Sequence, residues 1–457
     1  MSVLDRWFGL SAANTTVRAE AVGGLTTFLT MAYILFVQPA MLGAAGMDEG
    51  AVLAATCIAS AVATLVMGVW AKYPVALAPG MGLNAFFAFT ICGAMGVPWQ
   101  QALGLVLCSG VVFLLLGLFR LRERIVALVP RGLQHAIGAG IGVFIAFIGL
   151  KEAGLLVPDP NTFVGVGELG ARWKPVLTAG AGFVVAAILA SRKHPLAILA
   201  GIAVSLGVAL ALGVTTWHGA VAAPPSLAPT AFQVDLSFLF TPAGAGLALL
   251  FLYSDLFDTV GTLVGVGTQA GLIDEDGQLE RGDRAFLADA VGTVSGALLG
   301  TSTVTSYIES TAGVEAGART GLASVVTALL FLGALFLHPL VQTVGGGYPV
   351  EVGLFLTSGP GTQTLFIHPI TAPALILVGA LMAKGLGRIR WDHPPEAIPA
   401  FLIVVGIPLT FSIADGISLG VMAWSLLALA TRDRETPALL HLLAAVLAVR
   451  WLSEIPG

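Results

Sequence analysis

Long apolar stretches recur along nearly the whole chain, from residue 20 almost to the C-terminus. A helix needs about 20 mostly apolar residues to cross the hydrocarbon core of a bilayer, and many of these stretches reach that length. Of the 457 residues, 57% are hydrophobic and only 10% are charged, whereas roughly a quarter are charged in an ordinary soluble domain. The sequence therefore predicts an all-α polytopic membrane protein, held in membrane lipid and without a soluble domain of useful size.

The apolar segments form two sets of seven, separated by a polar, proline-rich loop. The first set is 20–44, 50–71, 75–95, 98–119, 134–150, 174–191 and 195–213. The second set is 243–268, 285–299, 303–316, 319–340, 369–386, 397–413 and 414–430. We therefore predict 14 transmembrane segments, several of them short or rich in glycine. One more apolar helix, 437–453, suits either a further crossing or the membrane interface, and the interfacial position is preferred.

The lysines and arginines indicate how these spans are oriented. With residues 1–19 in the cytoplasm, nearly all of the 21 basic residues fall in cytoplasmic loops. Only Lys151, Arg172 and Lys174 fall outside, and Arg450 lies in the last helix. This follows the positive-inside rule, so we predict a multi-pass protein of the cell inner (plasma) membrane with both termini cytoplasmic. The N-terminal segment lacks the features of a signal peptide, and the absence of a basic patch gives no reason to expect nucleic acid.

The two sets of spans echo each other. The piece AVATLVMG at 61–68 leads into ALAPGMGLNAFFAF, and the piece AVGTVSG at 290–296 leads into GTSTVTSYIESTAG. Seven spans separate the copies, so the second copy is inverted in the membrane, an arrangement typical of transporters. In such folds the broken segments at matching places meet near the midplane and form the substrate site. These segments are 77–90 in span three and 301–315 in span ten.

Acidic residues inside spans are costly in lipid and usually functional. Asp255 and Asp258 are three residues apart, which places both on one helical face, and Glu309 lies in the second broken segment. Asn84 lies in the first, where Gly80 and Gly82 would let the backbone approach a ligand. Structural alternatives remain: Asp255 could pair with the backbone or Ser254, and Asn84 could join two helices. Asp289 and Glu315 lie near span ends, where solvated or capping roles are favoured.

Carboxylates that accept protons and an amide that both donates and accepts suit a planar heterocycle with ring N–H groups and ring or carbonyl acceptors. A nucleobase has this chemistry. Aromatic side chains could stack on its face; the candidates are Phe86, Phe87, Phe257 and Tyr307. A carboxylate in a partly dehydrated cavity can also take up and release a proton. Asp255, Asp258 and Glu309 are therefore candidates for coupling transport to protons, and sodium coupling is not excluded.

Five motifs, taken together, resemble those of the nucleobase:cation symporter-2 superfamily, in particular its AzgA-like adenine, guanine and hypoxanthine permeases. They are GLTTFLTMAYILF at 24–36, PGMGLNAFFAF at 79–89, HAIGAGIGVFIAFIGL at 135–150, SDLFDTVGTLVGV at 254–266 and TSTVTSYIESTAGVEAGARTGL at 301–322. The QNxG-type signature of xanthine and urate relatives is absent, because Glu309 is followed by Ser-Thr-Ala-Gly. The glycine-rich external stretch 345–369 is longer than this family leads us to expect.

The resemblance implies two inverted seven-span repeats with UraA-like core and gate domains. The core would comprise 20–119 and 243–340, and the gate 134–213 and 369–430. It implies substrate binding by Asn84, Asp258 and Glu309, with Asp255 as a fourth residue, and proton-coupled purine uptake by an elevator or rocking motion. Proteins of this architecture often form homodimers through the gate domain.

Rival functions have less support in the sequence. A xanthine or uracil symporter, or a sulfate-type anion transporter, would share the architecture, but an anion site would normally be neutral or cationic. An intramembrane aspartyl protease would need acids on separate helices, and no GxGD or HExxH motif is present. A channel would differ in lacking saturable, coupled flux. We expect no enzymatic activity and no cofactor.

Overall fold

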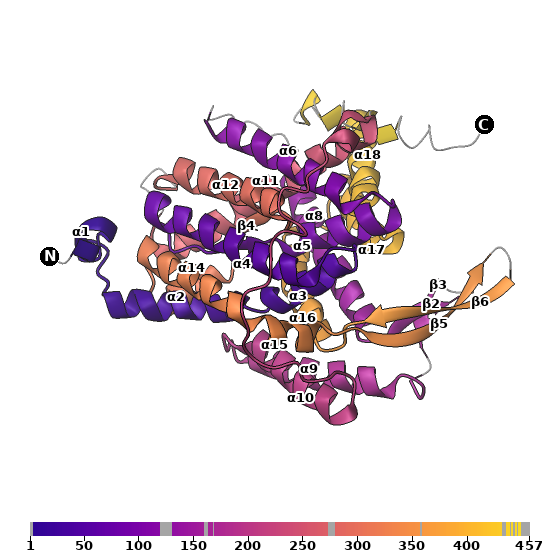
Figure 1. Cartoon of the computed structure of the whole chain (residues 1–457). Helices are drawn as coiled ribbons and strands as arrows, with labels where there is room; N and C mark the ends of the chain where they lie inside the picture. Colours follow the sequence, from indigo (N-terminus) through magenta and orange to yellow (C-terminus); the bar gives the residue numbers. More distant parts are fainter. Residues whose placement is uncertain are drawn as a thin grey trace.

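The computed structural model describes the chain except for residues 1–2, 119–129, 160–162, 168, 273–278, 357–358, 432–435, 439, 442–443, 446 and 449–457. Helices dominate it (Figure 1). Seven of the described helices are long and apolar enough to cross a membrane, the longest being α11 (Pro242–Ala270), and several others are shorter and apolar. The chain is thus a polytopic membrane protein, whereas the predicted number of 14 crossings remains a prediction.

The helices follow the predicted apolar segments closely. In the first half they are α2 (Val17–Met31), α3 (Ile34–Gly43), α4 (Glu49–Val66), α6 (Trp99–Leu118), α8 (Arg131–Glu152), α9 (Trp173–Ser191) and α10 (Ala197–Leu212). In the second half, besides α11, they are α12 (Gly282–Leu299), α14 (Gly321–Ala334), α15 (His338–Gly345), α16 (Ala372–Met382), α17 (Pro394–Thr410) and α18 (Ile413–Thr431). Shorter helical pieces are α1 (Val3–Phe8), π-helical η1 (Met67–Ala71), and 3-10 turns η3 (Ser237–Phe240), η4 (Leu335–Leu337) and η5 (Ala383–Arg388).

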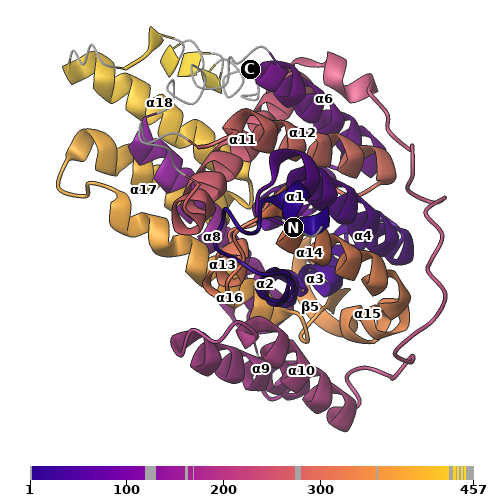
Figure 2. The ribbon, with the colours of Figure 1, turned by 90° about the vertical axis from the view of Figure 1, so that its left-hand side faces the viewer.

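The helices pack in two groups. In one group α14 lies against α2 and α4, while α12 lies against α4 and α6. In the other, α8 packs against α16 and α17, α17 against α18, and α9 against α10 and α16. Figure 2 shows α4, α6, α12 and α14 on one side of the molecule and α8, α17 and α18 on the other.

A buried acid ties the N-terminal span to its counterpart in the second half. Glu20 on α2 is fully buried, and its carboxylate accepts hydrogen bonds from the backbone N–H groups of Arg319, Thr320 and Ala323, at 2.8 to 3.2 Å. These groups begin α14, where a helix has unpaired N–H donors and favours negative charge. Glu20 thus caps α14, a neighbouring helix, as well as lying in the first turn of its own helix.

The glycine-rich stretch 345–369 is a β-hairpin, which the sequence analysis did not predict. Strand β5 (Tyr348–Leu356) pairs antiparallel with β6 (Gly359–Ile367), and β5 also contacts the smaller hairpin of β2 (Leu156–Asp159) and β3 (Phe163–Val166). Both hairpins project from the helical body at the end opposite α1 (Figure 1). The β-branched and aromatic residues in YPVEVGLFL and TQTLFI favour strands. The predicted helix at 437–453 lies largely outside the described residues.

Candidate functional site

The two broken segments meet at the centre of the molecule. Strand β1 (Leu77–Pro79) pairs antiparallel with β4 (Val304–Ser306), so Ala78 lies opposite Thr305. Two further backbone bonds extend the ladder, from Gly80 N to Thr303 O and from Tyr307 N to Ala76 O, both 2.9 Å. Each strand then leads into a short helix, α5 (Met81–Ala85) or α13 (Ser310–Glu315). The prediction that segments 77–90 and 301–315 are broken and come together is confirmed by this pairing.

Asn84 is fully buried on α5, which continues into the wider π-helical turns of η2 (Phe86–Ala94). Its side-chain oxygen Oδ1 accepts a hydrogen bond from the hydroxyl of Ser302, just before β4. Its amide nitrogen Nδ2 is buried and has no hydrogen-bond partner among the described residues. Buried polar groups are nearly always paired, so this nitrogen is a candidate donor for a ligand.

Asp258 and Glu309 are the accessible acids of the site. The side chain of Asp258 on α11 is exposed and that of Glu309, which precedes α13, is partly exposed. The two carboxylates are close enough to interact electrostatically. The hydroxyl of Tyr33, between α2 and α3, donates to Glu309 Oε1 at 2.9 Å. Asp258 and Glu309 are therefore the acids near the β1–β4 crossing whose side chains keep exposed surface.

Asp255 and Asp289 form a second, buried layer behind these acids. Asp255 Oδ2 accepts from the Thr293 hydroxyl at 2.8 Å, and its Oδ1 has no partner among the described residues. Asp289 accepts three hydrogen bonds: from Ser306 N at 2.8 Å, from the Ser306 hydroxyl at 2.6 Å and from the Thr259 hydroxyl at 2.8 Å. The expectation of a solvated or capping Asp289 is wrong, because this fully buried carboxylate fixes β4 to α11 and α12.

Close packing explains the two glycines predicted at the site. A Cβ on Gly80 would come within 2.8 Å of Thr305 Cγ2 and 3.8 Å of Asp258 Oδ2. A Cβ on Gly82 would come within 2.5 Å of Ile141 Cγ2 on α8. Gly80 thus lets β4 and Asp258 approach the first broken segment, and Gly82 lets α5 lie against α8.

The aromatic candidates differ in how they are placed. Phe86 and Phe87 are fully buried, and Phe86 packs on Phe251 with ring centroids 5.1 Å apart, so both are core residues. The buried Tyr307 donates its hydroxyl to Pro79 O at 2.5 Å, which adds a side-chain bond to the strand crossing. The side chain of Phe257 lies outside the described part of the structure.

Sequence reasoning missed Tyr33, Gln38 and Ser302. Tyr33 lies where the first span breaks between α2 and α3, and Gln38 is fully buried on α3. Gln38 Nε2 donates to the hydroxyls of Thr301 at 3.0 Å and Ser302 at 3.1 Å. A usable signal was present, because Tyr33 and Gln38 are polar residues within an otherwise apolar stretch.

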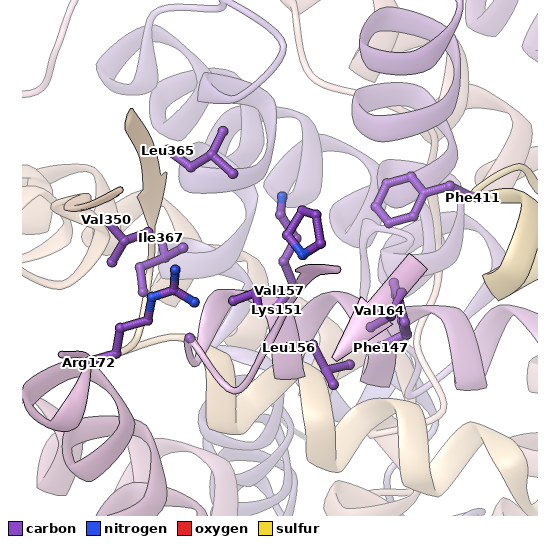
Figure 3. Close-up of a pocket in the computed structure, with 12 residues that line it drawn as sticks. Phe147, Lys151, Leu156, Val157, Val164, Arg172, Val350, Leu365, Ile367 and Phe411 are labelled. Atoms are coloured by element: carbon purple, nitrogen blue, oxygen red, sulfur yellow. The ribbon is translucent and has the colours of Figure 1, made fainter. Parts of the chain in front are cut away.

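A separate cavity of about 230 Å³ lies between the hairpins and α8 (Figure 3). Its walls are mostly apolar, with Phe147 and Phe411 on one side and Val350 and Leu365 on the other. Lys151 and Arg172 are the charged residues in its lining. None of the acids or amides of the strand crossing lines it. Carboxylate and amide chemistry is therefore concentrated at the crossing rather than in this cavity.

Comparisons with known proteins agree on the class of the chain. The model of the permease family (Xan_ur_permease) matches residues 18–356. The adenine permease AdeP of Escherichia coli is 42% identical over 94% of this chain and 91% of its own length. The guanine/hypoxanthine permease PbuG of Bacillus subtilis is 43% identical over 91% of this chain and 92% of its own length.

The fold also matches a solved structure. The transmembrane domain of the cyanobacterial bicarbonate transporter BicA superposes with a TM-score of 0.59 at 15% identity, over 87% of this chain and 97% of that domain. At this identity the likeness concerns the fold alone. The family model and the two permeases cover most of the chain. This protein therefore belongs to the permease family, as the resemblance to nucleobase:cation symporter-2 permeases predicts.

Proposed function

We propose that the protein takes up purine nucleobases, namely hypoxanthine, guanine and adenine, across the inner membrane. The observation that carries the proposal is the set of groups around the strand crossing: the accessible carboxylates of Asp258 and Glu309 and the unpaired amide nitrogen of Asn84. A purine offers ring N–H donors to carboxylates and ring nitrogen or carbonyl acceptors to an amide. The names of the permeases AdeP and PbuG point to the same substrates.

Alternating access would follow from relative movement of the two packing groups. In this proposal the group with α4, α6, α12 and α14 is the core, and the group with α8, α16 and α17 is the gate. Gly82 lies where a core helix meets the gate helix α8. Fourteen crossings with both termini cytoplasmic remain predictions of the sequence, and a homodimer through the gate remains a prediction of the resemblance.

Proton coupling would use the acids at the crossing. Glu309 or Asp258 would take up a proton with the site open outward, and substrate and proton would leave together inward, because the loaded and empty states interconvert more readily than partly loaded ones. Tyr33 would hold the Glu309 carboxylate in place through its hydrogen bond.

The test is uptake of radiolabelled hypoxanthine in cells that lack their own purine permeases. Competition by adenine or guanine, but not by xanthine, uracil or sulfate, is the expected result, with loss of uptake on adding a protonophore. Glu309→Gln and Asp258→Asn should each abolish uptake while the protein still reaches the membrane. Normal transport by both variants would refute the assigned roles, and sodium replacement separately tests the coupling ion.

A sulfate-type anion transporter is the second candidate on grounds of fold, because BicA shares the architecture. The acids count against it. An anionic substrate beside Asp258 and Glu309 would meet two like charges with no basic side chain described among their hydrogen-bond partners. Uptake of labelled sulfate that excess hypoxanthine does not compete would favour this alternative.

A further inference from the structure

A chain of hydrogen bonds runs through the buried centre of the protein from α3 to α5. Gln38 Nε2 donates to Ser302 Oγ at 3.1 Å and to Thr301 Oγ1 at 3.0 Å. Ser302 donates its hydroxyl hydrogen to Asn84 Oδ1, and Thr301 lies 3.1 Å from the Thr56 hydroxyl. All five side chains are fully buried. We call Gln38, Ser302 and Asn84 the amide relay.

Both ends of the amide relay carry an unpaired atom. Gln38 Oε1 at one end and Asn84 Nδ2 at the other are buried without a partner among the described residues. The Asn84 end adjoins the candidate site, because Asn84 N bonds to Gly80 O at 2.9 Å and a Cβ on Gly80 would lie 3.8 Å from Asp258 Oδ2. Asn84 therefore closes the first turn after Gly80, the residue that adjoins the Asp258 carboxylate, and a ligand held by Asp258 is taken to reach the free end of Asn84.

The amide relay can run in either direction. A serine hydroxyl both donates and accepts, and a side-chain amide carries a donor and an acceptor of similar size on one carbon. If Gln38 and Asn84 both turn over, Asn84 Nδ2 donates to Ser302, and the hydroxyls of Ser302 and Thr301 donate to Gln38 Oε1. Every contact keeps one donor and one acceptor. The free end of Asn84, however, changes from an N–H donor to a carbonyl acceptor.

Adenine and the 6-oxopurines differ in this same property. Adenine has a donor amino group at position 6 and an acceptor nitrogen at position 1. Hypoxanthine and guanine have an acceptor oxygen at position 6 and a donor N–H at position 1. Whichever of these two positions faces Asn84, the two classes need opposite hydrogen-bonding groups on the protein.

We infer that the amide relay reverses its direction with the substrate, so that one site binds both 6-amino and 6-oxo purines. The inference rests on the proposed purine uptake and deepens it. Each purine class stabilises the relay direction in which the free end of Asn84 complements its hydrogen-bonding groups. Binding then shifts the balance between two states already available to the protein. Gln38 and Ser302 are positioning residues, because they act on the substrate through Asn84.

Two substitutions fix the relay in one direction from opposite ends. Asn84→Asp places an acceptor at the substrate. Gln38→Glu accepts the Ser302 hydroxyl, so Ser302 must accept from Asn84 Nδ2 and the carbonyl of Asn84 faces the substrate. Both variants should therefore change the ratio of kcat/KM for adenine to that for hypoxanthine in the same direction, by about tenfold or more, because a site built for one hydrogen-bonding edge strongly rejects its opposite.

Thr303→Val is the matched control. Its hydroxyl is buried in the same segment as Ser302 but has no hydrogen-bond partner among the described residues, so its loss should leave the ratio unchanged. Ser302→Ala should raise KM for both purines, because neither relay direction remains intact. Ser302→Thr keeps a hydroxyl and should restore both KM values.

The measurement is uptake of labelled adenine and labelled hypoxanthine in the same permease-deficient cells, normalised to protein in the membrane. Opposite effects on the two purines, shared by Asn84→Asp and Gln38→Glu, support the relay. Equal losses for both purines, or a wild type that transports only one class, overturn the relay and leave purine uptake standing. No purine uptake by the wild type overturns the proposed function itself.

Discussion

Replacing Asp289 tests whether the buried acid layer holds the crossing of β1 and β4 in place. In Asp289→Ala the three hydrogen bonds from Ser306 N, Ser306 Oγ and Thr259 Oγ1 are lost together. The Thr259 hydroxyl retains an alternative partner, Thr305 Oγ1 at 3.1 Å. The backbone N–H of Ser306 faces only the carboxylate, so it becomes a buried donor without a partner.

The size of the effect follows from these contacts. A hydrogen bond to a charged group contributes about 1.5–3 kcal/mol, and a buried donor left unpaired costs about 1–3 kcal/mol. Allowing for the alternative partner of Thr259, we expect Asp289→Ala to lower the free energy of unfolding by about 3–5 kcal/mol. In Asp289→Asn the side-chain oxygen still accepts from Ser306, and the amide N–H can donate to the Thr259 hydroxyl oxygen. This variant should therefore lower the free energy of unfolding by only about 1 kcal/mol.

The assay is unfolding of purified protein in mild detergent, followed by tryptophan fluorescence, alongside purine uptake in cells. Thr259→Val is the matched control, because it removes one of the three donors. Its loss of unfolding free energy should lie between those of Asp289→Asn and Asp289→Ala. Uptake should decline in the same order, since Glu309 follows β4 directly along the chain and its position depends on that strand. If Asp289→Ala unfolds under the same conditions as the wild type, the carboxylate does not hold β4.

Three further predictions concern single contacts. Tyr33→Phe removes the 2.9 Å bond to Glu309 and should raise KM for purines several-fold at unchanged expression; an unaltered KM would contradict the positioning of Glu309 by this tyrosine. Gly82→Val should strongly reduce uptake, because its Cβ would meet Ile141 Cγ2 at 2.5 Å, and Ile141→Ala in the same chain should recover part of the activity; absence of recovery would place the defect elsewhere. Burial lowers the pKa of His368, but its hydrogen bond to Glu152, 3.0 Å from Nδ1, outweighs burial and leaves the pKa above the ordinary 6.5. This pair should therefore stabilise the protein fully below pH about 6.5 and lose its effect as the pH rises through the higher folded pKa of His368; thermal unfolding across pH should show that loss in the wild type, and His368→Gln should remove it.

The sequence predicted the crossing of the two broken segments better than the contacts around it. Acids within apolar spans stand out because lipid excludes charge, and the echo between 61–68 and 290–296 identified the two segments that pair. Asp258 and Glu309 were proposed as site residues on the first ground and Asn84 on the second, and their role in binding stays a prediction. Gln38 and Ser302 were not proposed, because amides and hydroxyls commonly join helices in membranes. Their contact spans 264 residues along the chain, and no local pattern encodes such a pairing.

Two further differences have local physical causes. No secondary structure was predicted for the glycine-rich stretch 345–369, whose β-branched and aromatic residues favour the strands β5 and β6. Asp289 was placed near a span end because its segment was predicted to begin at 285. Helix α12 begins at Gly282, which moves Asp289 inward, beside the hydroxyls of Thr259 and Ser306.

Unpaired polar atoms gather at the β1–β4 crossing, whereas the cavity beside the hairpins lies apart from it. Among the described residues, seven buried side-chain atoms lack a hydrogen-bond partner, and five of them lie in segments at or next to the β1–β4 crossing. They belong to Gln38, Ser60, Asn84, Asp255 and Thr303. Leaving such groups unpaired destabilises a folded protein, so their concentration at this crossing supports the proposal that substrate and protons bind there. In that proposal Asn84 and Asp255 are the groups that substrate or a proton would pair, and Thr303 is not one of them. In the proposed transport cycle Asn84 Nδ2 is the group that gains a partner from cargo, since a group already paired within the protein would gain less.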